Sequence, residues 1–155
     1  MPYRITGLDP APFAALFGAD EAVLAARGVL RMKADRDTGF PCRITLADAP
    51  AGTPLLLLNH LSRTDDGPYR ASHAIFVRED AREAAAYEGR IAPVMERRIL
   101  SLRGFDGTGL MVDALLAQPG EGDAGLRKLL DNPTIAEVDA HTATRGCFLA
   151  RARRA

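Results

Sequence analysis

The sequence is poor in cysteine, and its two cysteines lie far apart. Cys42 and Cys147 form no Cys-x-x-Cys pair, which excludes zinc-ribbon and thioredoxin-like motifs. We expect both thiols to be reduced rather than joined in a structural disulfide. No HExxH pattern occurs, and His60, His73 and His141 lack the short spacing of metal-ligating histidines. The sequence therefore predicts no metal site and no cofactor.

The sequence also lacks an excess of charge and long apolar runs. Lys+Arg 20 against Asp+Glu 20 gives a formal net charge of +0, which argues against a nucleic-acid binder that neutralises phosphates. The longest apolar run, Leu55 to Leu58, is far shorter than the roughly 20 residues that span a bilayer. Residues 1–7 show no basic-then-apolar signal pattern. We therefore expect a cytoplasmic protein with no nucleic-acid or membrane partner.

What the sequence does contain is a near-average globular composition with alternating apolar residues. Its 155 residues, 47% hydrophobic and 26% charged, suit one domain over residues 1–155. Period-two runs outnumber helical patterns, which predicts an α+β fold: a mainly antiparallel sheet with a few short helices packed on one side. The expected strands cover residues 3–8, 30–34, 42–46, 55–58, 74–77, 97–105, 110–117, 134–141 and 146–153. The expected helices lie between Asp9 and Gly18, between Asp20 and Gly28, and over residues 80–87 and 123–130.

Three of these segments, and one loop between them, carry more specific expectations. Residues 30–34 have the pattern of a half-buried strand, whereas the four leucines at 55–58 predict a central strand covered on both faces. Residues 110–117 fit helix and strand about equally; strand is favoured because glycines precede them and Pro119-Gly120 follows. Residues 62–68 have the composition of a polar loop.

The most site-like stretch is Pro68 to His73. It gathers Tyr69, Arg70, Ser72 and His73 before a strand, and functional residues are often found on loops that a rigid sheet positions. Arg70 could clamp a carboxylate or phosphate, and His73 could move a proton near neutral pH. A purely structural loop explains the same residues equally well.

Two further arginines are candidate neighbours of this loop. In a strand over residues 42–46, alternation sends Cys42 and Arg43 to opposite faces. For Cys42 a core position is favoured over a functional thiol. Arg103 shares one strand face with Ile99 and Ser101, and this face is expected to be buried. A buried arginine there either pairs with a carboxylate or receives an anionic ligand.

The C-terminal region offers a reactive side chain and a basic end. Cys147 lies in the second strand of a terminal hairpin, where it could pack, face Cys42 or pair with His141. Arg151, Arg153 and Arg154 are interpreted as a solvated strand end, in preference to a tail that contacts an anion or RNA.

Several strings along the chain resemble one bacterial family. They are Gly39-Phe-Pro-Cys-Arg43, Leu56-Leu-Leu-Asn59, Pro68-Tyr-Arg-Ala-Ser-His-Ala-Ile-Phe-Val-Arg78, Ser101-Leu-Arg103 and Gly146-Cys-Phe148. Taken in order, they resemble the domain of unknown function family 1203. The family pattern has Gly-Pro where His73-Ala74 stand and a second His where Asp139 stands, which weakens a universal catalytic role for histidines. The resemblance implies a small stand-alone bacterial protein and implies no activity, cofactor or partner.

These observations support two main hypotheses. The first is a site for an anionic small molecule, whether or not it is enzymatic. Its ligand-binding candidates are Arg43, Tyr69, Arg70, Ser72 and Arg103, and its catalytic candidates are His73 and Cys147. The alternative is a non-enzymatic homodimeric interaction module that pairs through a sheet edge or the terminal hairpin. A weaker third hypothesis is a thiol sensor that uses Cys42 and Cys147.

Overall fold

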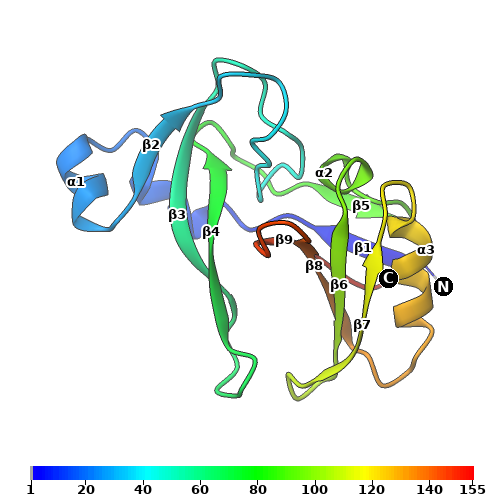
Figure 1. Cartoon of the computed structure of the whole chain (residues 1–155). Helices are drawn as coiled ribbons and strands as arrows, with labels where there is room; N and C mark the ends of the chain where they lie inside the picture. The colour runs from blue at the N-terminus through cyan, green and yellow to red at the C-terminus, as the bar shows by residue number, and fades with distance from the viewer. Residues whose placement is uncertain (1) are drawn as a thin grey trace.

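The chain folds into two antiparallel sheets (Figure 1). This computed structural model describes residues 2–155. The larger sheet has the order β5-β1-β9-β8-β6-β7, and the smaller has the order β2-β3-β4. The strands are β1 Tyr3–Thr6, β2 Leu30–Lys33, β3 Pro54–Arg63, β4 Ala71–Arg78, β5 Ala86–Glu88, β6 Leu100–Phe105, β7 Met111–Ala117, β8 Glu137–Thr142 and β9 Phe148–Arg154. The helices are η1 Ala11–Leu16, α1 Glu21–Ala26, α2 Pro93–Glu96 and α3 Gly122–Leu130.

These elements confirm the α+β class with mainly antiparallel sheets and a few short helices. Residues 110–117 form a strand, as the flanking glycines favoured, and the expected terminal hairpin is β8 and β9. Among residues 2–155, no helix has both the length and the apolarity needed to cross a membrane.

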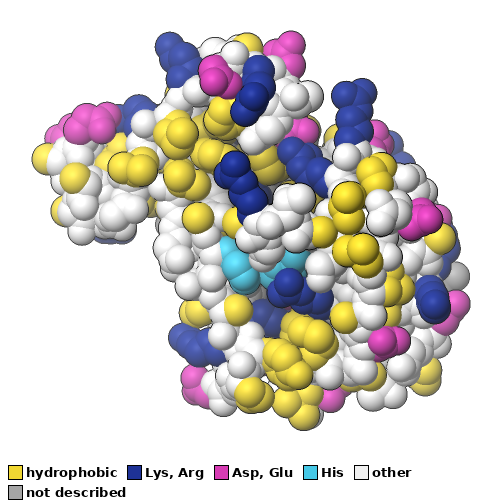
Figure 2. Space-filling model, viewed as in Figure 1, with side chains coloured by type: hydrophobic (Ala, Val, Ile, Leu, Met, Phe, Trp, Pro, Cys, Tyr) yellow, Lys and Arg dark blue, Asp and Glu magenta, His cyan; other side chains and the backbone are white. Residues whose placement is uncertain are grey.

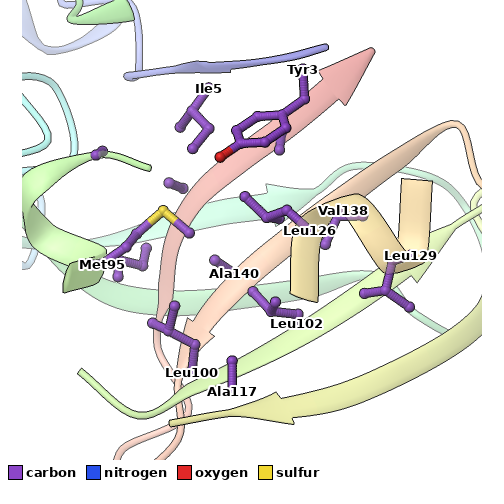
Figure 3. Close-up of a cluster of buried hydrophobic side chains, with 14 of the residues drawn as sticks. Tyr3, Ile5, Met95, Leu100, Leu102, Ala117, Leu126, Leu129, Val138 and Ala140 are labelled. Atoms are coloured by element: carbon purple, nitrogen blue, oxygen red, sulfur yellow. The ribbon is translucent and has the colours of Figure 1, made fainter. Parts of the chain in front are cut away.

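Helix α3 covers one face of the larger sheet and forms the main core with it (Figure 3). Leu126 and Leu129 point onto the sheet, as their helical spacing predicted. The helix approaches the sheet closely at Gly125, where a Cβ would lie only 2.7 Å from Cδ1 of Leu102. This close packing fixes which face of the sheet is apolar: Leu100 and Leu102 of β6 point toward α3.

A second core lies against the smaller sheet. The expected central strand is confirmed, because β3 pairs with both β2 and β4. Helix α1 begins at Asp20, whose carboxylate accepts the backbone N–H of Val23 at 2.9 Å, a standard N-cap. Leu24 of this helix packs with Phe13 and Leu56 in the second core.

The predicted strand at residues 42–46 is wrong. These residues form a tight turn in which the Leu46 N–H donates to the Cys42 carbonyl and Leu46 has a positive φ of 54°. All three alternating apolar residues are buried, but Cys42 and Ile44 enter the smaller core while Leu46 enters the larger one. A segment that bridges two cores can therefore show strand-like alternation without being a strand.

The predicted helix at residues 80–87 is also wrong. Residues 86–88 form β5, which pairs with β1. Just before β5, the Ala85 N–H donates to the Ile44 carbonyl at 2.9 Å, and the Ala85 carbonyl accepts the Gly7 N–H at 2.8 Å. These tertiary hydrogen bonds replace the helical ones, so the helix propensity of the Ala and Glu residues does not decide the outcome.

Other boundaries and exposures differ as well. β3 continues through Ser62 and Arg63, which were expected in a loop. β2 is an outer strand, and its apolar residues Leu30 and Met32 are exposed rather than half-buried. β6 starts at Leu100 because the short helix α2 precedes it.

The face of the larger sheet opposite α3 carries polar residues. Alternation along β6, β8 and β9 places Arg103, Asp139, His141 and Arg151 on this face, because their neighbours Leu102, Val138, Ala140 and Ala152 belong to the main core. The expectation for Arg103 is corrected accordingly, since the buried face of β6 is the one with Leu100 and Leu102. The smaller sheet lies across part of the polar face, and the candidate site forms where the two sheets meet.

Candidate functional site

All three histidines meet where the two sheets come together. His60 of β3 and His73 of β4 are directly opposite each other in the strand register. His141 of β8 reaches them from the larger sheet, with its ring centroid 5.0 Å from that of His73. Phe148 lies against both His60 and His141. Figure 2 shows the histidine side chains reaching the surface between the sheets, with Lys or Arg side chains beside them. We call His60, His73 and His141 the histidine cluster.

Hydrogen bonds fix how two of these imidazoles are oriented. Nδ1 of His141 lies 2.9 Å from the Gly146 carbonyl, which can only accept, so Nδ1 carries a proton and donates it. Nδ1 of His73 lies 3.3 Å from the Ser62 hydroxyl, which itself donates to the Ala71 carbonyl at 3.2 Å. His73 Nδ1 and the Ser62 hydroxyl are therefore hydrogen-bonded, with the donor set by the His73 tautomer. In the neutral His141 ring, Nε2 is left with a lone pair that can take up a proton.

The surroundings keep the histidine cluster neutral near pH 7. Burial is the largest cause and lowers the pKa of His141 to about 4; the Arg103 charge lowers it further, against the opposing effects of the Gly146 hydrogen bond and Asp139. Burial is also the largest cause that lowers the pKa of His60 and of His73. The Arg151 charge lowers the pKa of His60 further, and the Arg103 charge does the same for His73. The cluster is therefore a set of uncharged imidazoles in a positive field.

Two arginines that contribute to this field have no carboxylate partner among residues 2–155. Arg43 is buried and donates to two carbonyls, those of Pro41 at 2.7 Å and Phe148 at 2.9 Å. Desolvation lowers its pKa to about 10. Arg103 is half-buried, and its Nε donates to the Ser101 hydroxyl at 3.1 Å. Arg43 thus contributes positive charge from a buried position, whereas Arg103 is also accessible to solvent.

The neighbouring arginines, by contrast, form ion pairs with carboxylates. Asp139, which is 0% exposed, accepts from Arg151 at 2.6 and 3.0 Å and from Arg63 at 3.1 Å. Glu137 lies 2.8 Å from Arg63 and 2.7 Å from Arg153. We call these five residues the carboxylate network. Its hydrogen bonds raise the pKa of Arg151 although burial alone would lower it.

A cleft of about 250 Å³ opens beside the carboxylate network. Besides network residues, it is lined by Ser62, Thr64, Asp65, Asp106 and the 107–109 turn. Arg63 stacks over Phe105 at 3.8 Å, and its Nε is buried without a hydrogen-bond partner. Because acidic side chains line this cleft along with the arginines, it has no surplus of positive charge.

The structure brings together only part of the predicted set. His73 belongs to the histidine cluster, and Arg43 and Arg103 lie close enough to lower its pKa. Arg70 lies in the β3–β4 turn, where it donates to the Thr64 carbonyl at 2.6 Å and pairs with Asp66 at 3.5 Å. Tyr69 packs edge-on against Phe105. Ser72 is exposed and alternates with His73, so it lies on the other face of β4.

Both cysteines are free thiols. The buried Cys42 sulfur accepts the N–H groups of Thr45 and Arg78, both at 3.4 Å. Cys147 is partly exposed, and its thiol contacts the Arg145 carbonyl at 3.9 Å. Both sulfurs lie close enough to the Arg43 guanidinium to oppose, in part, the lowering of its pKa by burial.

The carboxylate network was missed from the sequence, although a signal for it exists. Glu137, Asp139 and His141 share one face of a strand by their period of two, as do Arg151 and Arg153. In an antiparallel hairpin, Glu137 pairs with Arg153 and Asp139 with Arg151. Opposite charges at such positions predict cross-strand ion pairs.

The expected solvated basic end is corrected for the same reason. Arg151 is part of the carboxylate network, and Arg153 is exposed but paired with Glu137. Arg154 donates to the Leu130, Asn132 and Ile135 carbonyls at 2.5–2.7 Å, which satisfies carbonyls left open at the end of α3.

Within the described part of the chain, no group of three or more His, Cys, Asp or Glu side chains is arranged to hold a metal ion. No curated protein and no solved structure matches the chain. A family model described as a protein of unknown function (DUF1203) matches residues 39–154. This range includes the three histidines, Arg43, Arg103 and the whole carboxylate network. The chain belongs to the DUF1203 family, as the resemblance of its sequence motifs predicted.

Proposed function

We propose that this protein binds a small anionic molecule, a carboxylate or a phosphate, at Arg103 and the histidine cluster. The observation that carries the proposal is the unpaired guanidinium of Arg103. It lies beside neutral imidazoles, and no carboxylate within residues 2–155 is in ion-pair distance of it. A guanidinium presents paired N–H donors that match both carboxylate and phosphate oxygens.

The electrostatics support the same ligand class. Arg43 and Arg103 place positive charge around the cluster without an ion pair of their own, which is an unfavourable arrangement in a partly desolvated region, although Asp48 and Asp139 offset part of that charge at longer range. A bound anion would offset that charge. It would also favour the protonated form of His73 and His141, whose Nε2 atoms could then donate to it.

Ligand-induced stabilisation tests this proposal. Wild-type protein is unfolded in urea with phosphate, acetate or chloride at equal ionic strength. A ligand present at 100 times its Kd raises the free energy of unfolding by about 2.7 kcal/mol. We expect phosphate or acetate to stabilise the wild type, and we expect Arg103→Gln to remove that effect.

Arg70→Gln is the matched control, because Arg70 is an arginine paired with a neighbouring carboxylate outside the cluster. It should respond to the anions as the wild type does. Equal unfolding curves in phosphate, acetate and chloride would refute the proposal, as would an unchanged response in Arg103→Gln.

A homodimer is the second candidate function, and the outer strand β2 favours it. Leu30 and Met32 are exposed on this strand, and Val23 of the adjacent helix α1 is exposed as well. The terminal hairpin offers no free edge, because β9 pairs with β1 and β8 pairs with β6. We expect Leu30→Glu to convert a dimer into a monomer in light scattering; a wild-type monomer at micromolar concentration would refute this candidate.

A further inference from the structure

An apolar strip lies next to Arg103 on the open face of the larger sheet. Leu116 of β7 is directly opposite Ser101, and Ala114 is directly opposite Arg103. Ile99 precedes Ser101 by two residues and is partly exposed. Side chains directly opposite each other on antiparallel strands lie on the same face, about 4.5–5.5 Å apart at Cβ. We call Ile99, Ala114 and Leu116 the apolar strip.

The protein's own core leaves the apolar strip uncovered. Leu100, Leu102 and Leu115 alternate with the strip and pack toward α3. Leu116 is 59% exposed and Ile99 is 38% exposed. β7 is the outermost strand of its sheet, so no further strand shields them. Figure 2 shows hydrophobic side chains over β6 and β7 beside the histidines.

We infer that the anion carries an apolar chain that lies along the apolar strip, an inference that rests on the proposed function. Arg103 and the histidine cluster would hold the head group, while Leu116 and Ile99 would contact the chain. Charge complementarity supports this occupant. The strip and its polar neighbours contain one cation and no acid: Ile99, Ser101, Arg103, Ala114 and Leu116. Asp113 is opposite Gly104 in the register, so its side chain lies on the other face of the sheet.

The dimensions suit a chain of medium length. Arg103 and Ile99 are four residues apart along one strand direction, which corresponds to roughly 13 Å at about 3.3 Å per residue. An extended eight-carbon carboxylate fits along such a strip. Each methylene that leaves water contributes favourably in proportion to the area buried, so affinity should rise with chain length.

Calorimetric titration with matched ligands tests the inference. Acetate is compared with octanoate below its micelle concentration, and inorganic phosphate with hexyl phosphate. We expect the longer ligand of whichever pair binds to bind the wild type at least about tenfold more tightly, the equivalent of roughly two methylenes fully buried. Leu116→Ser should remove most of this gain and leave the affinity for the short ligand unchanged.

Leu110→Ser is the matched control, because Leu110 is 48% exposed and lies just before β7, outside the apolar strip. It should keep the full gain with chain length. Equal affinity for short and long ligands in the wild type would overturn the inference while the proposed function stands. Absence of binding by all four ligands would overturn both.

Two further outcomes would overturn the inference alone. If Leu116→Ser weakened the short and long ligands equally, Leu116 would be acting on the head-group site rather than on the chain. If light scattering showed a wild-type dimer that Leu116→Ser dissociates, a second copy of the protein would be the occupant of the apolar strip.

Discussion

Two regions on the same sheet face use arginine in opposite ways. In the carboxylate network, Arg63 and Arg151 are held by Asp139, which has no exposed surface. One strand away, Arg103 is opposite Asp139 in the strand register but makes no ion pair with it; its Nε donates to Ser101, and its charge lowers the pKa of His141. The difference shows that arginines on one face can have different partners according to how the carboxylates are distributed. The proposed anion site therefore depends on which arginine lacks an ion pair, and not on the number of arginines.

The paired region has a structural consequence of its own. Arg63 belongs to the smaller sheet and Asp139 to the larger one, so their ion pair joins the sheets. Arg151 adds a second link by donating to the Ser62 carbonyl at 2.8 Å. We therefore expect the carboxylate network to contribute to stability and the histidine cluster to contribute to binding.

The largest expected effect comes from breaking the carboxylate network. Asp139→Asn leaves Arg151 with the partly buried Glu137, and Arg63 with Glu137 and the more exposed Asp65, as carboxylate partners. Removing one member of a buried ion pair costs about 3–5 kcal/mol, and we expect a loss of about 3 kcal/mol in urea unfolding. Asp66→Asn, at the exposed Arg70 pair, should leave the unfolding midpoint unchanged. Similar midpoints for both variants would show that the network does not stabilise the fold.

The pH dependence of stability should be the next largest effect. The pKa of His141 is about 4 in the folded protein and near 6.5 in the unfolded chain. Between these values the unfolded chain holds more protons, so the free energy of unfolding falls as the pH drops from about 7 to 4. At about 1.36 kcal/mol per pKa unit, His141 accounts for about 3 kcal/mol of this loss.

His141→Gln checks that assignment. Gln is neutral at every pH tested and can still donate to the Gly146 carbonyl. The variant should therefore lose distinctly less stability between pH 7 and 4 than the wild type. Urea unfolding at one-unit pH steps measures both slopes, and parallel slopes would contradict the burial of a neutral His141.

A smaller effect on stability is expected from Arg103→Gln, which removes the arginine that has no carboxylate partner. Removing this unpaired charge should raise the pKa of both His73 and His141, because the Arg103 charge lowers both. The free energy of unfolding should change by less than about 0.5 kcal/mol, as for most substitutions away from buried contacts. Imidazole NMR titration measures the pKa values. Unchanged values would place Arg103 outside the field of the cluster.

The smallest effect is expected from Arg70→Gln. Arg70 lies in the β3–β4 turn and contacts the Thr64 carbonyl and Asp66. Exposed ion pairs of this kind contribute little to stability. The same NMR titration should therefore give wild-type values for the histidine cluster. A clear shift would show that Arg70 belongs to the site after all.

The sequence predicted those parts of the fold that local patterns specify. The alternation at residues 134–153 marks a hairpin, and Leu126 and Leu129 mark the buried side of α3. The two wrong elements are segments whose backbone bonds to distant strands. Residues 42–46 turn between two cores, and Ala85 is held by Ile44 and Gly7. No local pattern contains those partners.

The site was predicted only in part for a similar reason. His73, Arg43 and Arg103 were selected for their chemistry, and the fold gathers them. His60 was considered only as a metal ligand, and His141 also as a possible partner of Cys147. They join the cluster through pairing between strands, which sequence spacing does not record. Arg70 carried equal weight in the sequence, but its own turn contains the Thr64 carbonyl and Asp66 that occupy it.

Proton uptake on anion binding tests the central claim most directly. Sulfate does not titrate near pH 7, so any proton exchanged on its binding belongs to the protein. Calorimetric titration of the wild type with sulfate is done in two buffers of different ionisation enthalpy, with Arg103→Gln as the comparison. We predict binding whose heat differs between the buffers in the sense of proton uptake, and no binding to Arg103→Gln. Binding with the same heat in both buffers, or equal binding by Arg103→Gln, would contradict an anion site at Arg103 and the histidine cluster.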